Sequence, residues 1–134
     1  MFSRKIKIIS KIETRKGVDN IDELIKVSDG IMIARGDLGK DISFEKIPMI
    51  QKSINKKCNK KNIISITATE MMPSMTKYKR PSRAEVTDVA NAILEGSEFL
   101  LLAEETAIGK YPVLSVKSIK KIIKETEKHK RSLR

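Results

Sequence analysis

The stretch IMIARGDLGKD, residues 31–41, begins as an apolar run and becomes charged within a few residues. Apolar runs without a polar face are typical of strands that are covered on both sides, as in parallel sheets. Four short runs have this character: IKIIS (6–10), GIMIA (30–34), NIISIT (62–67) and EFLLLA (98–103). The pattern therefore predicts four buried strands.

Each predicted strand is followed by a segment whose apolar residues recur at helical spacing. These segments are residues 20–27, 43–58, 82–94 and 112–122. Ser82 and Glu85 have the spacing of a capping box, which marks the start of the third segment. Pro112 opens the fourth, and its inward face is expected to be Val113, Val116, Ile119 and Ile122. Alternating strands and helices predict a single α/β domain with a parallel sheet.

The composition of the 134 residues limits the class of protein. A hydrophobic content of 40% suits a packed core, and no apolar stretch approaches the roughly 20 residues of a membrane span. The start of the chain carries charges inside its apolar run, unlike a secretory signal. Cys58 is the single cysteine, so no internal disulfide can form. We therefore expect a cytoplasmic protein without a membrane partner.

The formal net charge of +11 raises nucleic acid as a possible partner. The lysines are spread over the polar faces of several segments, and aromatic residues make up only 4% of the chain. A nucleic-acid site normally needs clustered cations and aromatic side chains that stack on bases. The sequence therefore favours a solvated lysine-rich surface over nucleic-acid binding.

Polar side chains gather where each predicted strand ends. They are Lys11 and Glu13; Arg35, Gly36 and Asp37; Thr67, Thr69 and Glu70; and Glu104, Glu105 and Thr106. In parallel α/β folds, ligands bind at the carboxyl edge of the sheet, because loops and helix N-termini converge there. The RGD tripeptide is thus predicted to be the point at which a buried strand reaches a binding site.

The residue types at this edge suit phosphoryl transfer. Glu13 and Asp37 offer two carboxylates, the hard oxygen ligands that Mg²⁺ prefers. Lys11 lies two residues before Glu13, so in an extended segment both side chains point to the same side. Gly36 allows a ligand to approach the backbone N–H, and Thr69 offers a hydroxyl. A metal ion and an ammonium group together neutralise the charge that develops on a transferring phosphoryl group.

Five segments in series resemble pyruvate kinase: IISKIETRKGV, VSDGIMIARGDLG, ITATEMM, RPSRAEVTDVANAILEG and AEETAIGKYPV, within residues 5–127. The resemblance implies half of a (β/α)8 TIM barrel over residues 1–134, with strands five to eight and their helices. It also implies that the family's lid domain and C-terminal regulatory domain are absent. The family transfers a phosphoryl group from phosphoenolpyruvate to ADP in glycolysis, giving pyruvate and ATP. It uses Mg²⁺, for which Mn²⁺ can substitute, and K⁺, whose ligands belong to the other half of the barrel.

The resemblance also assigns roles to individual residues. Lys11 is similar to the lysine that stabilises the transferring phosphoryl group and the enolate. Glu13 and Asp37 match the carboxylates that bind Mg²⁺. The backbone amides of Gly36 and Asp37 match donors to the substrate carboxylate, and Thr69 matches the substrate-binding threonine.

Arg35 is expected to orient its neighbours by ion pairing, and no catalytic role is assigned to Asp88 or Asn91. The sequence also departs from the family pattern. Glu70 stands where glutamine is usual, and Ala103-Glu104 stands where Ser-Gly is usual. Both glutamates introduce negative charge near the expected phosphate, which disfavours an anionic substrate unless they are paired.

Other functions are compatible with the same residues. If half a barrel cannot act alone, the chain needs a complementing N-terminal half to turn over phosphoenolpyruvate and ADP. A half-barrel also exposes two strand edges and an apolar interior, which favours pairing with another copy. A non-catalytic remnant or self-associating interaction module is therefore the main alternative, and a basic nucleic-acid-binding domain is the second.

Overall fold

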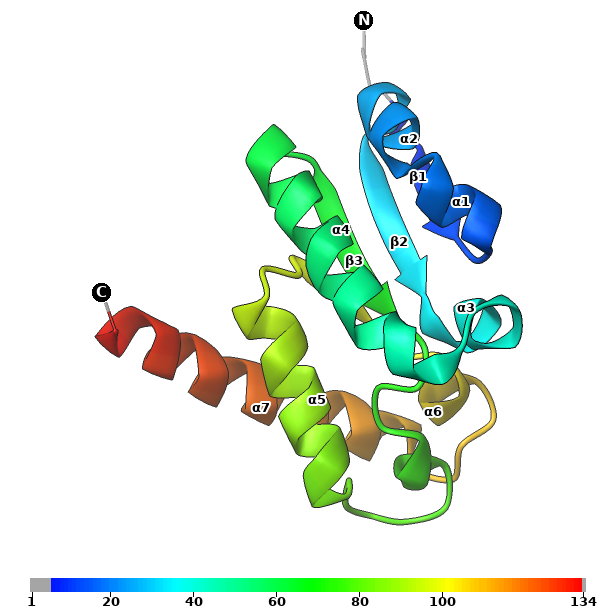
Figure 1. Cartoon of the computed structure of the whole chain (residues 1–134). Coiled ribbons are helices and arrows are strands. Elements are labelled where there is room, and N and C mark those ends of the chain that lie inside the picture. The colour runs from blue at the N-terminus through cyan, green and yellow to red at the C-terminus, as the bar shows by residue number, and fades with distance from the viewer. Residues whose placement is uncertain (1–5, 134) are drawn as a thin grey trace, which may run out of the picture.

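The computed structural model describes residues 6–133 and has a four-stranded parallel sheet as its frame (Figure 1). Its strands are β1 (Ile9–Ile12), β2 (Gly30–Ala34), β3 (Ile64–Ala68) and β4 (Phe99–Leu101), in the order β1-β2-β3-β4. Lys11 pairs with Met32, Met32 with Ile66, and Ile66 with Phe99. The predicted α/β class with a parallel sheet is confirmed.

The first strand lies later in the chain than the sequence predicts. Parallel pairing begins at Ile9, opposite Gly30, while Ile8 exchanges hydrogen bonds with Asp29 ahead of the ladder. Ile6 is 85% exposed, so the apolar run of residues 6–10 does not coincide with the strand. Lys11 consequently lies within β1 rather than after it.

Helices follow every strand. They are α1 (Arg15–Asp19), α2 (Ile21–Val27), α3 (Arg35–Asp41), the 3₁₀ turn η1 (Phe44–Lys46), α4 (Ile47–Lys61), the 3₁₀ turn η2 (Pro73–Thr76), α5 (Arg83–Leu94), α6 (Glu104–Ala107) and α7 (Pro112–Ser132). The short helices α1, α3 and α6 were not predicted, because each is too short to show an apolar period. Helix α3 starts at the residue after β2.

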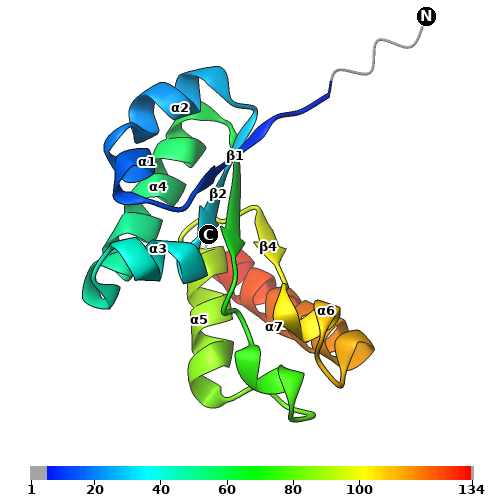
Figure 2. The same cartoon turned by 90° about the vertical axis from the view of Figure 1, so that its right-hand side faces the viewer.

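The core consists of two apolar clusters. The first contains Ile31 and Ile33 of β2 together with Ile54 and Cys58 of α4. The second contains the loop methionines Met71, Met72 and Met75 with residues of α5 and α7, which lie side by side in both views (Figure 2). The carboxyl end of β3 and its loop therefore rest on a packed base.

The other sheet face is less covered. Met32 and Ile66 are half-buried, and Phe99 is 54% exposed. Strand side chains alternate between faces, so these residues point away from the buried Ile31 and Ile33. The prediction that the strands are covered on both sides is therefore wrong for residues 6–133.

The capping box predicted at Ser82 is present. Glu85 N–H donates to Ser82 Oγ over 3.2 Å, and Ser82 N–H donates to Glu85 Oε2 over 2.7 Å. Glu85 also accepts from Ser74 N–H over 2.8 Å. Burial opposes ionisation of Glu85, but the hydrogen bonds from Ser74 and Ser82 prevail and lower the pKa of its carboxyl.

Glu85→Ala is expected to lower the free energy of unfolding by about 1–2 kcal/mol, because it removes acceptors at a helix start and beneath the β3 loop. A lowered folded pKa means that the stabilisation is complete above the ordinary glutamate pKa of about 4.3 and is lost as the pH falls through the folded value. Urea denaturation at pH 7 and pH 3 measures both effects. The control is Thr87→Ala, on an exposed position of α5. Equal losses in both variants would contradict the prediction.

Helix α7 buries half of the inward face predicted for it, because Ile119 is buried and Ile122 packs against the second apolar cluster. Val113 is 66% exposed and Val116 is 42% exposed, whereas Ser115, Ile119 and Thr126 are buried. The buried stripe includes polar residues because α7 packs on α5 and α6, and the Ser115 hydroxyl donates to Tyr111 O. The helix also continues to Ser132, beyond the predicted segment of residues 112–122. Across residues 6–133, no helix is both long and apolar enough to cross a membrane.

Candidate active site

Lys11 and Glu13 form an ion pair at the end of β1. The distance from Lys11 Nζ to Glu13 Oε1 is 2.6 Å, while Ile12 between them is fully buried on the opposite face. Both side chains therefore lie on the same side, as their two-residue spacing predicts. The hydrogen bond and charge of Glu13 raise the pKa of Lys11, with a smaller contribution from Asp37. Lys11 thus remains an ammonium group at neutral pH.

Asp37 lies in the first turn of α3, and its charge and that of Lys11 influence each other. Its carboxylate accepts from Lys40 Nζ over 3.1 Å, and this bond is the main cause of its lowered pKa. The charge of Lys11 lowers the pKa of Asp37 further. The two carboxylates predicted to bind a metal ion therefore both lie within the electrostatic influence of Lys11, and a lysine is paired with each of them.

Gly36 and Thr69 connect the ends of β2 and β3. Gly36 N–H donates to Thr69 Oγ1 over 2.8 Å. A Cβ atom at Gly36 would lie 3.4 Å from that oxygen, so there is little room above van der Waals contact between the two residues. The Thr69 hydroxyl accepts here and keeps its own proton to donate to a ligand. A ligand oxygen that accepts a hydrogen bond from Gly36 N–H would have to displace the Thr69 hydroxyl.

Arg35 is buried beneath this edge and is 9% exposed. Its guanidinium donates to Thr69 O and to Glu70 O, over 2.8 and 2.9 Å from Nη2. Its Nη1 lies 2.8 Å from Asp88 in α5. Ion pairing of Arg35 was expected from the sequence, but its partner Asp88 was not identified. The two residues are 53 positions apart, and no local pattern links them.

A cavity of about 360 Å³ opens at the same edge of the sheet. It is lined by Gly36, Asp37, Lys40, Thr69, Glu70, Pro73, Ala103, Glu104 and Glu105. Lys11 and Glu13 are not among its lining residues, and Lys40 was not predicted to contribute. Four acidic residues and one lysine line this cavity, so its lining carries a net negative charge.

Glu105 is buried in the wall of this cavity, at 2% exposure. Its carboxylate accepts from Met72 N–H over 2.8 Å and from Ala103 N–H over 2.9 Å. These bonds join the loop after β3 to the end of β4. Both carboxylate oxygens accept hydrogen bonds from backbone N–H groups, so Glu105 has a structural role in the cavity wall.

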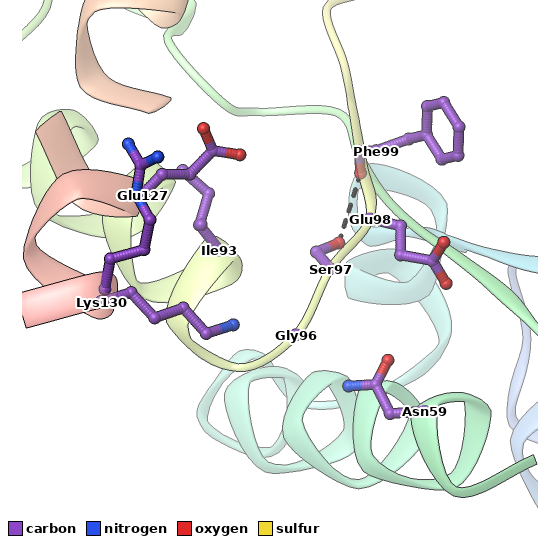
Figure 3. Close-up of a pocket in the computed structure, with 9 residues that line it drawn as sticks. Asn59, Ile93, Gly96, Ser97, Glu98, Phe99, Glu127 and Lys130 are labelled. Carbon is purple, nitrogen blue, oxygen red and sulfur yellow. Dashed lines mark hydrogen bonds between the residues drawn. The ribbon is translucent and has the colours of Figure 1, made fainter. Parts of the chain in front are cut away.

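A larger cavity of about 710 Å³ lies at the opposite end of the sheet (Figure 3). It is bounded by the end of α4, the loop before β4 and the last turns of α7. Its lining includes Asn59, Gly96, Glu98 and Lys130. The polar residues singled out at the carboxyl ends of the strands are absent from this lining. The smaller cavity is therefore the candidate active site.

Comparison with known proteins gives the same family over nearly the whole chain. The pattern described as "Pyruvate kinase, barrel domain" matches residues 2–116. The pyruvate kinase of Clostridium perfringens is 51% identical over 124 residues, which is 92% of this chain and 26% of that protein. The pyruvate kinase of Thermococcus litoralis is 55% identical over 126 residues, which is 94% of this chain and 26% of that protein.

The similarity extends to a eukaryotic relative. The pyruvate kinase of Dictyostelium discoideum is 54% identical over 124 residues, covering 92% of this chain and 24% of that protein. The chain thus spans about a quarter of the length of the curated relatives it matches. Its parallel strands and alternating helices agree with part of a TIM barrel. The chain therefore belongs to the pyruvate kinase family, a family of phosphotransferases, and its strand–helix units are part of the barrel domain of that family.

Proposed function

We propose that this chain supplies strands five to eight of a pyruvate kinase barrel and, with them, part of a site that transfers a phosphoryl group from phosphoenolpyruvate to ADP. The observation that supports this most is the convergence of Lys11, Glu13 and Asp37 at the sheet edge that also holds the Gly36–Thr69 hydrogen bond. The part of this chain that matches covers 26% of each of the two relatives from Clostridium perfringens and Thermococcus litoralis. We therefore propose that turnover requires a complementing N-terminal half of the barrel.

Glu13 and Asp37 fit a divalent cation. They are two hard oxygen donors on neighbouring strand ends, and Mg²⁺ commonly takes one or two protein carboxylates and leaves its other positions to water and substrate. Lys11 and Lys40 balance these carboxylates in the structure. When bound, Mg²⁺ or Mn²⁺ would supply positive charge opposite the oxygens of the phosphoryl group and the enolate.

The remaining groups would bind and orient the substrate. The Lys11 ammonium would hold a positive charge where negative charge develops on the enolate oxygen. Such preorganised charge lowers the activation free energy of the reaction. The Gly36 N–H would donate to the substrate carboxylate instead of to Thr69 Oγ1. The Thr69 hydroxyl would then donate to the substrate. Arg35 holds the carbonyls of Thr69 and Glu70 in place from below.

Binding of Mn²⁺ and oxalate tests the proposal. Oxalate resembles the enolate of pyruvate, and Mn²⁺ reports its surroundings through the relaxation of solvent protons. We expect the isolated chain to bind Mn²⁺ and oxalate to change the relaxation enhancement of the bound ion. A folded chain that shows no effect of oxalate would contradict the proposed function.

The glutamates at the rim of the cavity are expected to weaken anion binding. Glu70 and Glu104 are exposed and line the cavity together with Asp37. The double variant Glu70→Gln/Glu104→Gln is expected to bind oxalate in the presence of Mn²⁺ about fivefold more tightly, because solvent-exposed charges contribute up to about 1 kcal/mol. Glu125→Gln/Glu127→Gln, at two exposed positions of α7, is the control for net charge. No gain over this control would contradict the prediction.

A second candidate function is self-association through the open face of the sheet. Phe99 is 54% exposed and continues an apolar row with the half-buried Met32 and Ile66. Sedimentation velocity tests this second function. The wild-type chain is expected to sediment as a dimer, and Phe99→Lys is expected to sediment as a folded monomer. A wild-type chain that sediments as a monomer would exclude it.

A further inference from the structure

The loop after β3 contains two consecutive residues with left-handed backbone. Thr69 has φ 67° and Glu70 has φ 53°, and neither is glycine. This conformation is unfavourable for residues with a Cβ atom, and it persists only where surrounding contacts hold it. Because Thr69 places its hydroxyl next to Gly36 N–H, the strained turn lies inside the candidate active site.

The contacts that hold the turn come from Arg35. Its Nε donates to Thr69 O over 3.1 Å, and its Nη2 donates to Thr69 O and Glu70 O over 2.8 and 2.9 Å. One planar guanidinium thus fixes the carbonyls of both left-handed residues. A lysine could not make these bonds together, because its ammonium lacks the fork geometry.

The orientation of Arg35 is in turn set by Asp88. Nη1 of Arg35 lies 2.8 Å from both carboxylate oxygens of Asp88, and its other contact, with Gln51 Oε1, is longer at 3.4 Å. Among residues 6–133, Asp88 is the anionic group paired with this buried cation. A buried guanidinium needs such a counter-charge, and without it the side chain would turn toward solvent. Asp88 does not line the cavity.

We propose that Asp88 is a positioning residue. Acting through Arg35, it keeps the Thr69–Glu70 turn left-handed and so keeps the Thr69 hydroxyl beside Gly36 N–H. Helix α5 thereby controls the geometry of a site that it does not touch. The consequence for ligand binding rests on the proposed function, whereas the consequence for the backbone does not.

The backbone consequence is measured without a ligand. In Asp88→Asn, the ¹³Cα and ¹³Cβ shifts of Thr69 and Glu70 are expected to leave left-handed values, and the Gly36 amide is expected to exchange faster with solvent. The resonances of β1 and β2 should stay in place, which shows that the fold is retained. Asn91→Ala, on an exposed position of the same helix, is expected to change none of these signals. Unchanged Thr69 and Glu70 signals in Asp88→Asn would overturn the proposal.

The ligand consequence separates positioning from folding. Asp88→Asn is expected to weaken oxalate binding to the Mn²⁺ complex about tenfold while the affinity for Mn²⁺ alone stays the same, because Glu13 and Asp37 are untouched. Asp88→Glu keeps the charge and should restore most of the oxalate affinity. Equal loss in Asp88→Asn and Asn91→Ala would overturn the proposal.

The two proposals fail in different ways. If the wild-type chain binds no oxalate, the proposed function fails, and the chemical shifts of Thr69 and Glu70 still decide the role of Asp88. If Asp88→Asn does not fold, the shifts are compared in Asp88→Ser, which also removes the counter-charge of Arg35. Movement confined to Thr69, Glu70 and Gly36 supports the proposal, and its absence overturns it.

Discussion

Replacing Arg35 with methionine is expected to lower the free energy of unfolding by about 3 kcal/mol. The variant leaves the carbonyls of Thr69 and Glu70 without their donor, removes the partner of Asp88, and leaves two left-handed residues without the contacts that hold them. Each of these effects destabilises the same loop. Because small domains are stable by only about 5–15 kcal/mol, the loss is a large fraction of the total.

Urea denaturation monitored by circular dichroism measures this loss. Arg83→Met is the matched control, since Arg83 is an exposed arginine at the start of α5 and the substitution is the same. Equal midpoints for the two variants would show that the buried arginine does not hold the loop. A double-mutant cycle of Arg35→Met with Asp88→Asn should give a coupling of at least about 1 kcal/mol, because residues within one ion-pair network are not additive.

Glu13→Gln is expected to weaken Mn²⁺ binding by on the order of 100-fold. Loss of a residue that only hydrogen-bonds to a metal ligand already lowers metal affinity by about 10–100-fold, and Glu13 is proposed to bind the metal directly. The substitution preserves the shape of the side chain and removes one of the two carboxylates. It also releases the Lys11 ammonium from its 2.6 Å ion pair, which leaves a positive charge beside the cation site. The oxalate effect should disappear with the metal ion.

Isothermal titration with Mn²⁺, with and without oxalate, measures the effect of this substitution. Glu23→Gln is the matched control, because Glu23 forms a 2.7 Å ion pair with Lys26 on the exposed side of α2. Its Mn²⁺ affinity should equal that of the wild-type chain. If Glu13→Gln binds Mn²⁺ as tightly as Glu23→Gln does, Glu13 is not a metal ligand, and the lysine–glutamate pair is a surface ion pair.

The features that the sequence predicted correctly depend on residues that are close in the chain. The strands β2, β3 and β4 follow from continuous apolar runs, the main helices follow from apolar periodicity, and the Ser82–Glu85 capping box follows from a three-residue spacing. The common side of Lys11 and Glu13 follows from the two-residue period of an extended chain. These features are local because backbone hydrogen bonding and side-chain direction repeat over a few residues.

Other features were decided only by packing between distant elements. The buried face of α7 was predicted to include Val113 and Val116, but contact with α5 and α6 buries Ser115 instead, while Ile119 is buried as predicted. The Gly36–Thr69 hydrogen bond spans 33 residues, and the Arg35–Asp88 ion pair spans 53. Sequence by itself therefore determined the elements, the family resemblance and the residue types at the sheet edge. Tertiary structure decided which of those residues meet, because contacts between distant segments depend on how helices and strands pack and not on local spacing.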